Sequence, residues 1–141
     1  MTLTIRDLAE GDALTPMVIA VTATVIVAGA VATRDFMPVH HDKAYAESQG
    51  APDIFMNILS SNAYCSRFLT DWAGPEAVVR RVAIRLGVPV FPNSTLTFTG
   101  TVSSIDVATA TVEVTLQAST PMGDHLTGTA SLCLPRGGAS G

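Results

Sequence analysis

The spacing of hydrophobic residues in the first half of the chain is typical of helices and one short strand. Residues 17–21 form an apolar run that predicts a strand, and residues 25–33 predict a helix that is apolar on most sides. A broad apolar face predicts a central buried helix over residues 54–70. Asp53 is a good N-cap for this helix, and the Trp-Ala-Gly-Pro segment at residues 72–75 ends it.

From residue 78 onward, polar and apolar residues alternate instead. In residues 81–86, Val, Ile and Leu occupy every second position, which is the pattern of a strand with one buried face. Three further strands, rich in Thr and Val and joined by short turns, are expected at residues 96–105, 110–119 and 126–134. The order predicts an α+β architecture, in which an antiparallel sheet wraps around the long central helix and buries its apolar face.

Length and composition favour one domain that has a partner. The chain of 141 residues suffices for a single domain at residues 14–134, preceded by an N-terminal lead-in of residues 1–13 and followed by a flexible tail of residues 135–141. Apolar residues make up 48% of the chain and charged residues only 14%. The charged fraction of an average soluble protein is roughly a quarter. This deficit predicts that another subunit covers part of the apolar surface.

The same composition argues against several classes of function. The net charge of −4 and the single lysine, Lys43, leave no basic stripe for nucleic acid. The apolar run at residues 17–32 has 16 residues, fewer than the roughly 20 that span a bilayer, so no membrane segment is expected. Cys65 and Cys133 fit two reduced side chains in the cytoplasm rather than a disulfide framework. The sequence contains no Gly-rich phosphate loop and no cluster of metal ligands, so neither a cofactor nor a metal is expected.

The most informative candidate chemistry lies between Asp35 and His40. Pro38 bends the segment that joins them, so their side chains can converge on one point, as they could not along a straight strand or a regular helix. A carboxylate beside an imidazole makes an acid–base group that works near neutral pH. The spacing alone leaves a purely structural pair open. Asp124 and His125, by contrast, fall in an expected hairpin turn, and turn chemistry accounts for them.

The residues around the Asp/His pair resemble a known motif. Asp-x-x-Pro-Val-His at residues 35–40, with Ala46 six positions after the His, is similar to the hydratase motif of the MaoC-like (R)-specific enoyl-CoA hydratases. Residues 86–96, a strand end followed by a proline turn, resemble a second segment of that family. The resemblance implies a hot-dog fold, a CoA-thioester substrate and the addition of water to an enoyl group.

A closer resemblance is to the small MaoC-like subunit of actinobacterial steroid side-chain hydratases. It implies a bulky steroid enoyl-CoA as substrate, a place in steroid degradation, and a heteromer with a second MaoC-like subunit. A homodimer remains the alternative. The resemblance is carried by residues 32–36, 39–42, 53–55, 57–59, 70–75 and 86–89.

The family resemblance also implies roles for particular residues. Asp35 and His40 become the acid–base pair, and the backbone N–H groups of Met56 and Asn57, at the start of the central helix, polarise the thioester carbonyl. Two departures from the family pattern occur. Where the family usually has Asn two positions after the Asp, this chain has Met37. Where the family usually has His-Gly at the helix start, this chain has Met56-Asn57, and the side chain of Asn57 would reshape the pocket. Two neighbouring side chains are expected to support the pair or to lie in solvent: His41 and Asp42.

Two other functions compete with a hydratase. A hot-dog acyl-CoA thioesterase usually needs a carboxylate on or beside the central helix, and the candidate there, Asp53, is better explained as a cap. A non-catalytic MaoC-like subunit would only complete a partner's pocket. The presence of both Asp35 and His40 speaks against that alternative, because a purely structural subunit needs neither.

Overall fold

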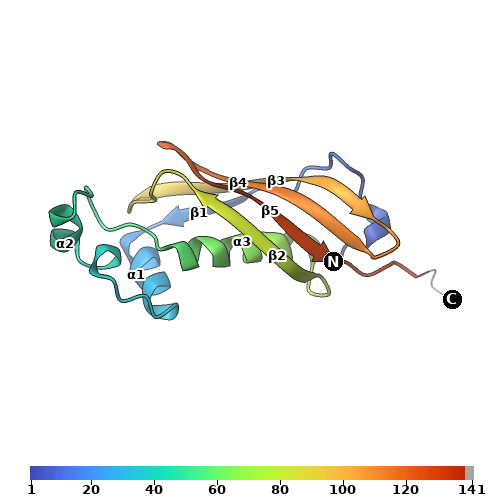
Figure 1. Ribbon diagram of the computed structural model, residues 1–141, viewed down its shortest axis with the longest axis horizontal. Coiled ribbons are helices and arrows are strands. Elements are labelled where there is room, and N and C mark those ends of the chain that lie inside the picture. The colour runs from blue at the N-terminus through green and yellow to red at the C-terminus, as the bar shows by residue number, and fades with distance from the viewer. Residues whose placement is uncertain (139–141) are drawn as a thin grey trace.

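The computed structural model describes residues 1–138, and its strands form one antiparallel sheet that curves along a long helix (Figure 1). The strand order is β1-β3-β4-β5-β2, so β1 and β2 are the edge strands. In chain order the elements are the 3₁₀ turn η1 (Ile5–Asp7), β1 (Met17–Val21), α1 (Ala23–Ala32), the 3₁₀ turn η2 (Pro38–His40), α2 (Lys43–Ser48), α3 (Ile58–Ala73), β2 (Val78–Leu86), β3 (Ser94–Asp106), β4 (Thr111–Thr120) and β5 (Gly123–Cys133).

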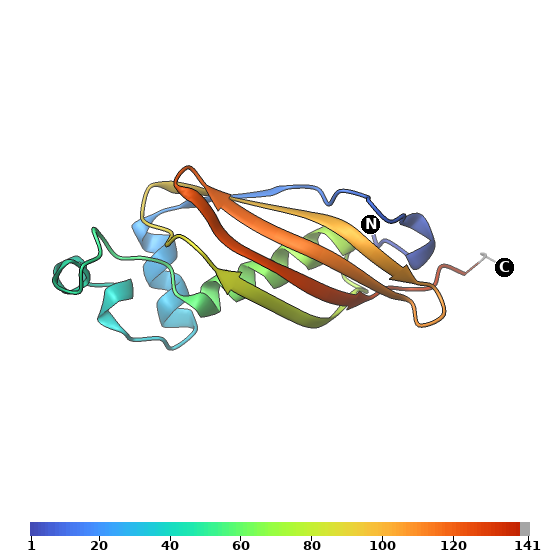
Figure 2. The ribbon, with the colours of Figure 1, turned by 45° about the horizontal axis from the view of Figure 1, so that its top comes forward.

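The sheet covers one side of α3, and the shorter helices α1 and α2 lie at the end where α3 begins (Figure 2). Every strand pairing is antiparallel. The expected α+β architecture, a sheet wrapped around a long central helix, is therefore confirmed. Strand β3 extends beyond its predicted range at both ends, and β4 is shifted by one residue. Strand β5 begins at Gly123, so Gly123 and Asp124, assigned to a turn from the sequence, belong to a strand.

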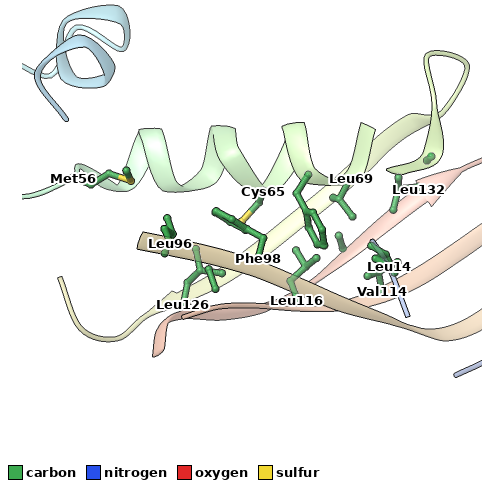
Figure 3. Close-up of a cluster of buried hydrophobic side chains, with 14 of the residues drawn as sticks. Leu14, Met56, Cys65, Leu69, Leu96, Phe98, Val114, Leu116, Leu126 and Leu132 are labelled. Carbon is green, nitrogen blue, oxygen red and sulfur yellow. The ribbon is translucent and has the colours of Figure 1, made fainter. Parts of the chain in front are cut away.

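The hydrophobic core lies between α3 and the inward face of the sheet (Figure 3). On α3, Cys65, Phe68 and Leu69 are almost completely buried. Leu96 and Phe98 of β3 meet them from the sheet, and the centroids of the Phe68 and Phe98 rings lie 5.9 Å apart. The alternate, outward-facing positions of β3 are largely Thr and Ser, so the period-two pattern separates an apolar face from a polar one.

The central helix begins four residues later than predicted, at Ile58. Asp53 is not its N-cap, because the Asp53 carboxylate accepts the adjacent backbone N–H at 2.7 Å. The N–H of Met56 donates to the carbonyl of Val90 at 3.0 Å, which holds the intervening segment outside the helix. Asn57 caps the helix instead: its Oδ1 accepts the backbone N–H three residues further on at 3.2 Å.

Helix α1 crosses close to the first turn of α3. Thr22 caps α1 by accepting the N–H of Val25 at 3.1 Å. Gly29 faces Ser60 of α3 so closely that a Cβ at position 29 would overlap the Ser60 hydroxyl. Glycine thus lets the backbone of α1 approach α3. Helix α1 has ten residues, and no helix within residues 1–138 is long and apolar enough to cross a membrane.

The chain ends pack more closely against the domain than the sequence indicates. Ile5 is 1% exposed, and its N–H donates to the carbonyl of Pro135 at 2.9 Å. The guanidinium of Arg136 donates to two carbonyl oxygens in the turn between β3 and β4, at 3.1 and 2.7 Å. Two further backbone N–H groups within residues 1–13, those of Leu3 and Gly11, donate to the carbonyls of Ala73 and Val102 at 3.0 and 2.8 Å. Residues 139–141 of the predicted tail lie outside the described residues.

Candidate active site

The loop that follows α1 brings Asp35 and His40 together. Asp35 Oδ2 and His40 Nε2 lie 3.4 Å apart. Arg34 has a left-handed backbone conformation with φ of 57°, and the N–H of Asp35 donates to the carbonyl of Ala30 at 2.9 Å, which ends α1 and turns the chain. The 3₁₀ turn that Pro38 opens then returns His40 to the carboxylate. Two side chains five positions apart therefore face each other across a bent loop.

His40 is held in one orientation by the segment before α3. His40 is 8% exposed, and its Nδ1 lies 2.7 Å from the carbonyl oxygen of Phe55. A carbonyl can only accept, so Nδ1 carries the hydrogen and Nε2 is the nitrogen turned to Asp35. The Phe55 ring packs edge-on against the imidazole, at a centroid distance of 5.1 Å. The tautomer and the ring plane are thus fixed before any substrate arrives.

Two amide groups hold the Asp35 carboxylate. The side-chain Nδ2 of Asn57 donates to Oδ2 at 3.1 Å, and the backbone N–H of Met37 donates to Oδ1 at 3.3 Å. The hydrogen bond from Asn57 is the main reason that the pKa of Asp35 lies below its usual value; Met37 and His40 act in the same direction and burial acts against them. Asp35 is therefore an anion at neutral pH, ready to orient a water molecule or to stabilise an imidazolium.

Backbone N–H groups at the start of α3 are the candidate donors to a substrate oxygen. The Met56 N–H is not free for this role, because its hydrogen is directed at the carbonyl of Val90. Within residues 1–138, no protein acceptor is assigned to the N–H groups of Asn57, Ile58 and Leu59. These groups point outward from a helix N-terminus, where the helix dipole also favours negative charge. Of the two expected donors, the structure therefore leaves Asn57, with its helical neighbours, available.

A cavity of about 280 Å³ connects the acid–base pair with the start of α3. Asp35 and His40 line it from the loop, Ile58 from the start of α3, and residues 86–89 from the end of β2 and the turn that follows. Its remaining walls are mostly apolar, so a bound acyl group would be shielded from water near the acid–base pair. Two larger hollows, of about 470 and 600 Å³, are lined by no acidic or basic side chain in the described part of the chain and offer no comparable chemistry.

His125, which the sequence pattern assigned to a turn, is a buried residue of this cavity. It is 2% exposed, its Nδ1 lies 2.7 Å from the carbonyl oxygen of Val88, and its Nε2 lies 2.8 Å from Ser61 Oγ. It is the extra residue of a bulge in β5, between the pairs Ala118–Leu126 and Ser119–Asp124, so it faces inward in a strand rather than outward in a turn. It ties the wall of the cavity to α3, and both ring nitrogens are already engaged.

The buried His125 makes a prediction about stability and pH. Burial lowers the pKa of His125 below its usual 6.5, while the bond to Val88 acts in the other direction. His125 is therefore protonated at a higher pH in the unfolded chain than in the folded chain. We expect the free energy of unfolding to fall as the pH drops below about 6.5, because protonation then favours the unfolded state. Urea unfolding between pH 7.5 and 5 should show a smaller decline for His125→Gln than for the wild type.

His41→Gln is the matched control for this measurement, because His41 is exposed. It should keep the pH dependence of the wild type. An unchanged decline in His125→Gln would refute the assignment of this stability change to His125.

His41 and Asp42 follow His40 in the chain, and their side chains bond to the backbone. His41 Nε2 is 3.3 Å from the carbonyl oxygen of Phe36, and its side chain is exposed. Asp42 caps α2 by accepting the N–H of Tyr45 at 3.1 Å. Neither side chain is hydrogen-bonded to Asp35 or His40 in the described structure.

The chain is similar in sequence to known proteins. A family model described as "MaoC like domain" matches residues 9–121. The chain is also similar to the 3-oxo-4,17-pregnadiene-20-carboxyl-CoA hydratase beta subunit of Mycobacterium tuberculosis. The two are 44% identical over 111 residues, which is 79% of this chain and 84% of that protein.

Solved structures are similar over most of the chain. A chain in the crystal structure of the ChsH1-ChsH2 complex from Mycobacterium tuberculosis is 39% identical, with a TM-score of 0.86 over 89% of this chain and 98% of that one. The (R)-hydratase from A. caviae involved in PHA biosynthesis gives a TM-score of 0.85 at 21% identity, over 92% of this chain and 99% of that one. At 21% identity, the similarity to the (R)-hydratase concerns the fold alone. The two structural similarities together confirm the expected hot-dog fold.

Proposed function

The chain belongs to the MaoC-like domain family, and from that premise we propose that it is a subunit of an enoyl-CoA hydratase. It adds water across the 2,3 double bond of an acyl-CoA thioester, with Asp35 and His40 as the acid–base pair. The observation that carries this proposal is the approach of Asp35 Oδ2 to His40 Nε2 at 3.4 Å, beside the start of a buried helix. Hydration needs an acid–base pair and a donor to an enolate oxygen, and the cavity offers both.

The proposed reaction uses one water held between the pair. Asp35 accepts a hydrogen bond from this water, and His40 Nε2, with Nδ1 held by Phe55, faces the same point. As the water oxygen attacks Cβ, the pair takes one proton from it and a proton is delivered to Cα, so the pair ends in its starting state. The free N–H groups around Asn57 and Ile58 bind the thioester oxygen as it gains charge, an effect typically worth about 3–4 kcal/mol.

We further propose that the acyl group is a bulky steroid side chain and that a second MaoC-like subunit completes the site. The sequence relative is named as a hydratase of a pregnadiene carboxyl-CoA, and the structural relative comes from a two-protein complex. The cavity of about 280 Å³ lies just below the range of roughly 300–1,000 Å³ for pockets of drug-sized ligands, so a bulky substrate needs room that this chain alone does not enclose. Two large apolar side chains that line the cavity, Ile58 and Leu86, are exposed. Phe36, Met37 and Leu59, which are near Asp35 or Ile58 in sequence, are exposed as well, and such apolar side chains fit a protein interface.

We place this enzyme in the cytoplasm. Cys65 and Cys133 are both free thiols in the structure. Unpaired cysteines with no disulfide fit a reducing compartment.

The proposed activity predicts a specific absorbance change. The chain, alone and mixed with its partner subunit, is incubated with a steroid side-chain enoyl-CoA, and the absorbance of the conjugated double bond is followed. We expect this absorbance to fall in the mixture, with no release of free thiol, because hydration removes the conjugation and keeps the thioester intact.

The same assay separates the two rival functions. Free thiol would indicate a thioesterase, a function that the cavity disfavours because Asp35 is the carboxylate lining it and Asp53 is engaged elsewhere. No change in absorbance and no free thiol in any mixture would indicate a subunit that does not catalyse either reaction. A saturated acyl-CoA serves as the control substrate and should give no change.

A further inference from the structure

Asn57 uses the two ends of its side-chain amide for different tasks. It is 1% exposed, and Oδ1 accepts the backbone N–H of Ser60, which caps α3. Nδ2 donates to Asp35 Oδ2 at 3.1 Å and to Thr33 Oγ1 at 2.9 Å. The carboxylate can only accept and the N–H of Ser60 can only donate, so these partners fix which end of the amide faces which way.

The hydrogen bonds of Asn57 connect three parts of the fold. Thr33 ends α1, and its hydroxyl donates to the carbonyl of Gly29 at 2.8 Å, so Nδ2 is held from the α1 side as well. Asp35 belongs to the loop that carries the acid–base pair. Through the cap on Ser60, the same amide is fixed to the first turn of α3. The Asp35 carboxylate is thereby held relative to the N–H groups that open the helix.

Among the described residues, Asn57 is the one whose side-chain amide donates to Asp35. Met37 offers its backbone N–H to Asp35 Oδ1 at 3.3 Å, but its thioether side chain has no donor and is 47% exposed. His40, the titratable group that acts on Asp35, faces the carboxylate on the side of the cavity. Asn57 therefore supplies the side-chain N–H that holds Oδ2.

We propose that Asn57 is a positioning residue for hydration, whose Nδ2 holds the Asp35 carboxylate against His40 while Oδ1 fixes that amide to the start of α3. The inference rests on the proposed hydratase function. It assigns Asn57 a task in addition to the backbone role expected from the sequence. The alternative is a purely structural role for Asn57 as a helix cap, since Asn is among the best N-caps.

Asn57→Ser separates the two tasks. The serine hydroxyl keeps an acceptor for the cap but is too short to donate to Asp35. In the complex with the partner subunit, we expect kcat to fall about 10- to 100-fold, the size expected for loss of a hydrogen bond to a charged group. KM should change little, because the lost contact does not touch the acyl chain. The acid limb of the rate profile should move to higher pH, since the carboxylate loses a donor that favours its charged form.

Asn57→Asp provides a second variant that keeps the cap. It places another carboxylate against Asp35, and like charges disfavour ionisation, so the acid limb should move further upward than in Asn57→Ser. Asn62→Ser is the matched control: it removes the same amide from the same helix, where the side chain takes no part in the hydrogen bonds of Asp35. It should leave kcat and the pH profile unchanged.

NMR titration of the Asp35 carboxyl group distinguishes failure of this inference from failure of the hydratase assignment. The titration requires no turnover, and the Asp35 pKa should rise in both Asn57 variants whatever the reaction is. An unchanged Asp35 pKa together with wild-type kcat in Asn57→Ser would overturn the inference and leave Asn57 as a cap. A raised pKa with no hydration by the wild-type complex would uphold the contact and overturn the reaction.

Discussion

Replacing Asp35 by Asn is expected to lower kcat for hydration about 10²- to 10⁴-fold in the assembled enzyme, the usual contribution of a positioned acid–base group. Asn keeps the size of the side chain and removes the negative charge that holds the water and faces His40. His40→Ala should produce a loss of similar size, because it removes Nε2 altogether. The measurement is the steady-state decline of enoyl absorbance with the partner subunit present.

Neither substitution should unfold the protein. The Asp35 side chain is 27% exposed, and His40 lies at the cavity rather than within the hydrophobic core. Asp53→Asn and His41→Ala are matched controls, because they alter a carboxylate and an imidazole that do not line the cavity. They should retain most of the activity. Near-normal turnover of both Asp35→Asn and His40→Ala would remove the basis of the proposed mechanism.

A second large effect is expected at Phe98, on the stability of the domain. Its ring is fully buried between Phe68 and Tyr64 of α3, at centroid distances of 5.9 and 6.3 Å. Phe98→Ala should lower the free energy of unfolding by about 3–5 kcal/mol, because it removes buried apolar area and leaves a cavity. Urea unfolding followed by circular dichroism, at one fixed protein concentration, measures this change.

Thr99→Ala is the control for Phe98, because Thr99 is the next residue of β3 and points outward. Its effect should stay within about 0.5 kcal/mol. A loss of less than about 1 kcal/mol in Phe98→Ala would mean that the contact between sheet and helix contributes little to stability.

The architecture could be predicted from the sequence because the hydrophobic periods in its two halves are distinct. The period of two after residue 78 and the apolar face of the long helix gave the sheet and the element it surrounds, and the family motif at residues 35–40 gave the hot-dog fold. The predicted start of α3 was wrong, because Asp53 and Asn57 are both residue types that commonly cap a helix, and local sequence does not choose between them. The choice between them depends on the bond from Met56 to Val90, which is distant in sequence.

The candidate site was predictable only in its local part. Asp35 and His40 share one loop, so a short motif could reveal them. The contact of Asn57 with Asp35 spans 22 positions and that of Ser61 with His125 spans 64, and both depend on how the helices and the sheet pack. A bulge in β5 that reverses the direction of one side chain leaves no trace in the alternating pattern.

The close crossing of α1 and α3 at Gly29 bears on how such an enzyme changes during evolution. Asp35 lies three residues after the end of α1 and its N–H is bonded to the carbonyl of Ala30, so a larger residue at position 29 would push that helix, and the carboxylate with it, away from α3. A misplacement of about 1 Å caused by a mutation far from the reacting atoms can lower a rate about 100-fold. Natural variation or directed evolution can therefore adjust turnover at this crossing without altering any group that meets the acyl chain.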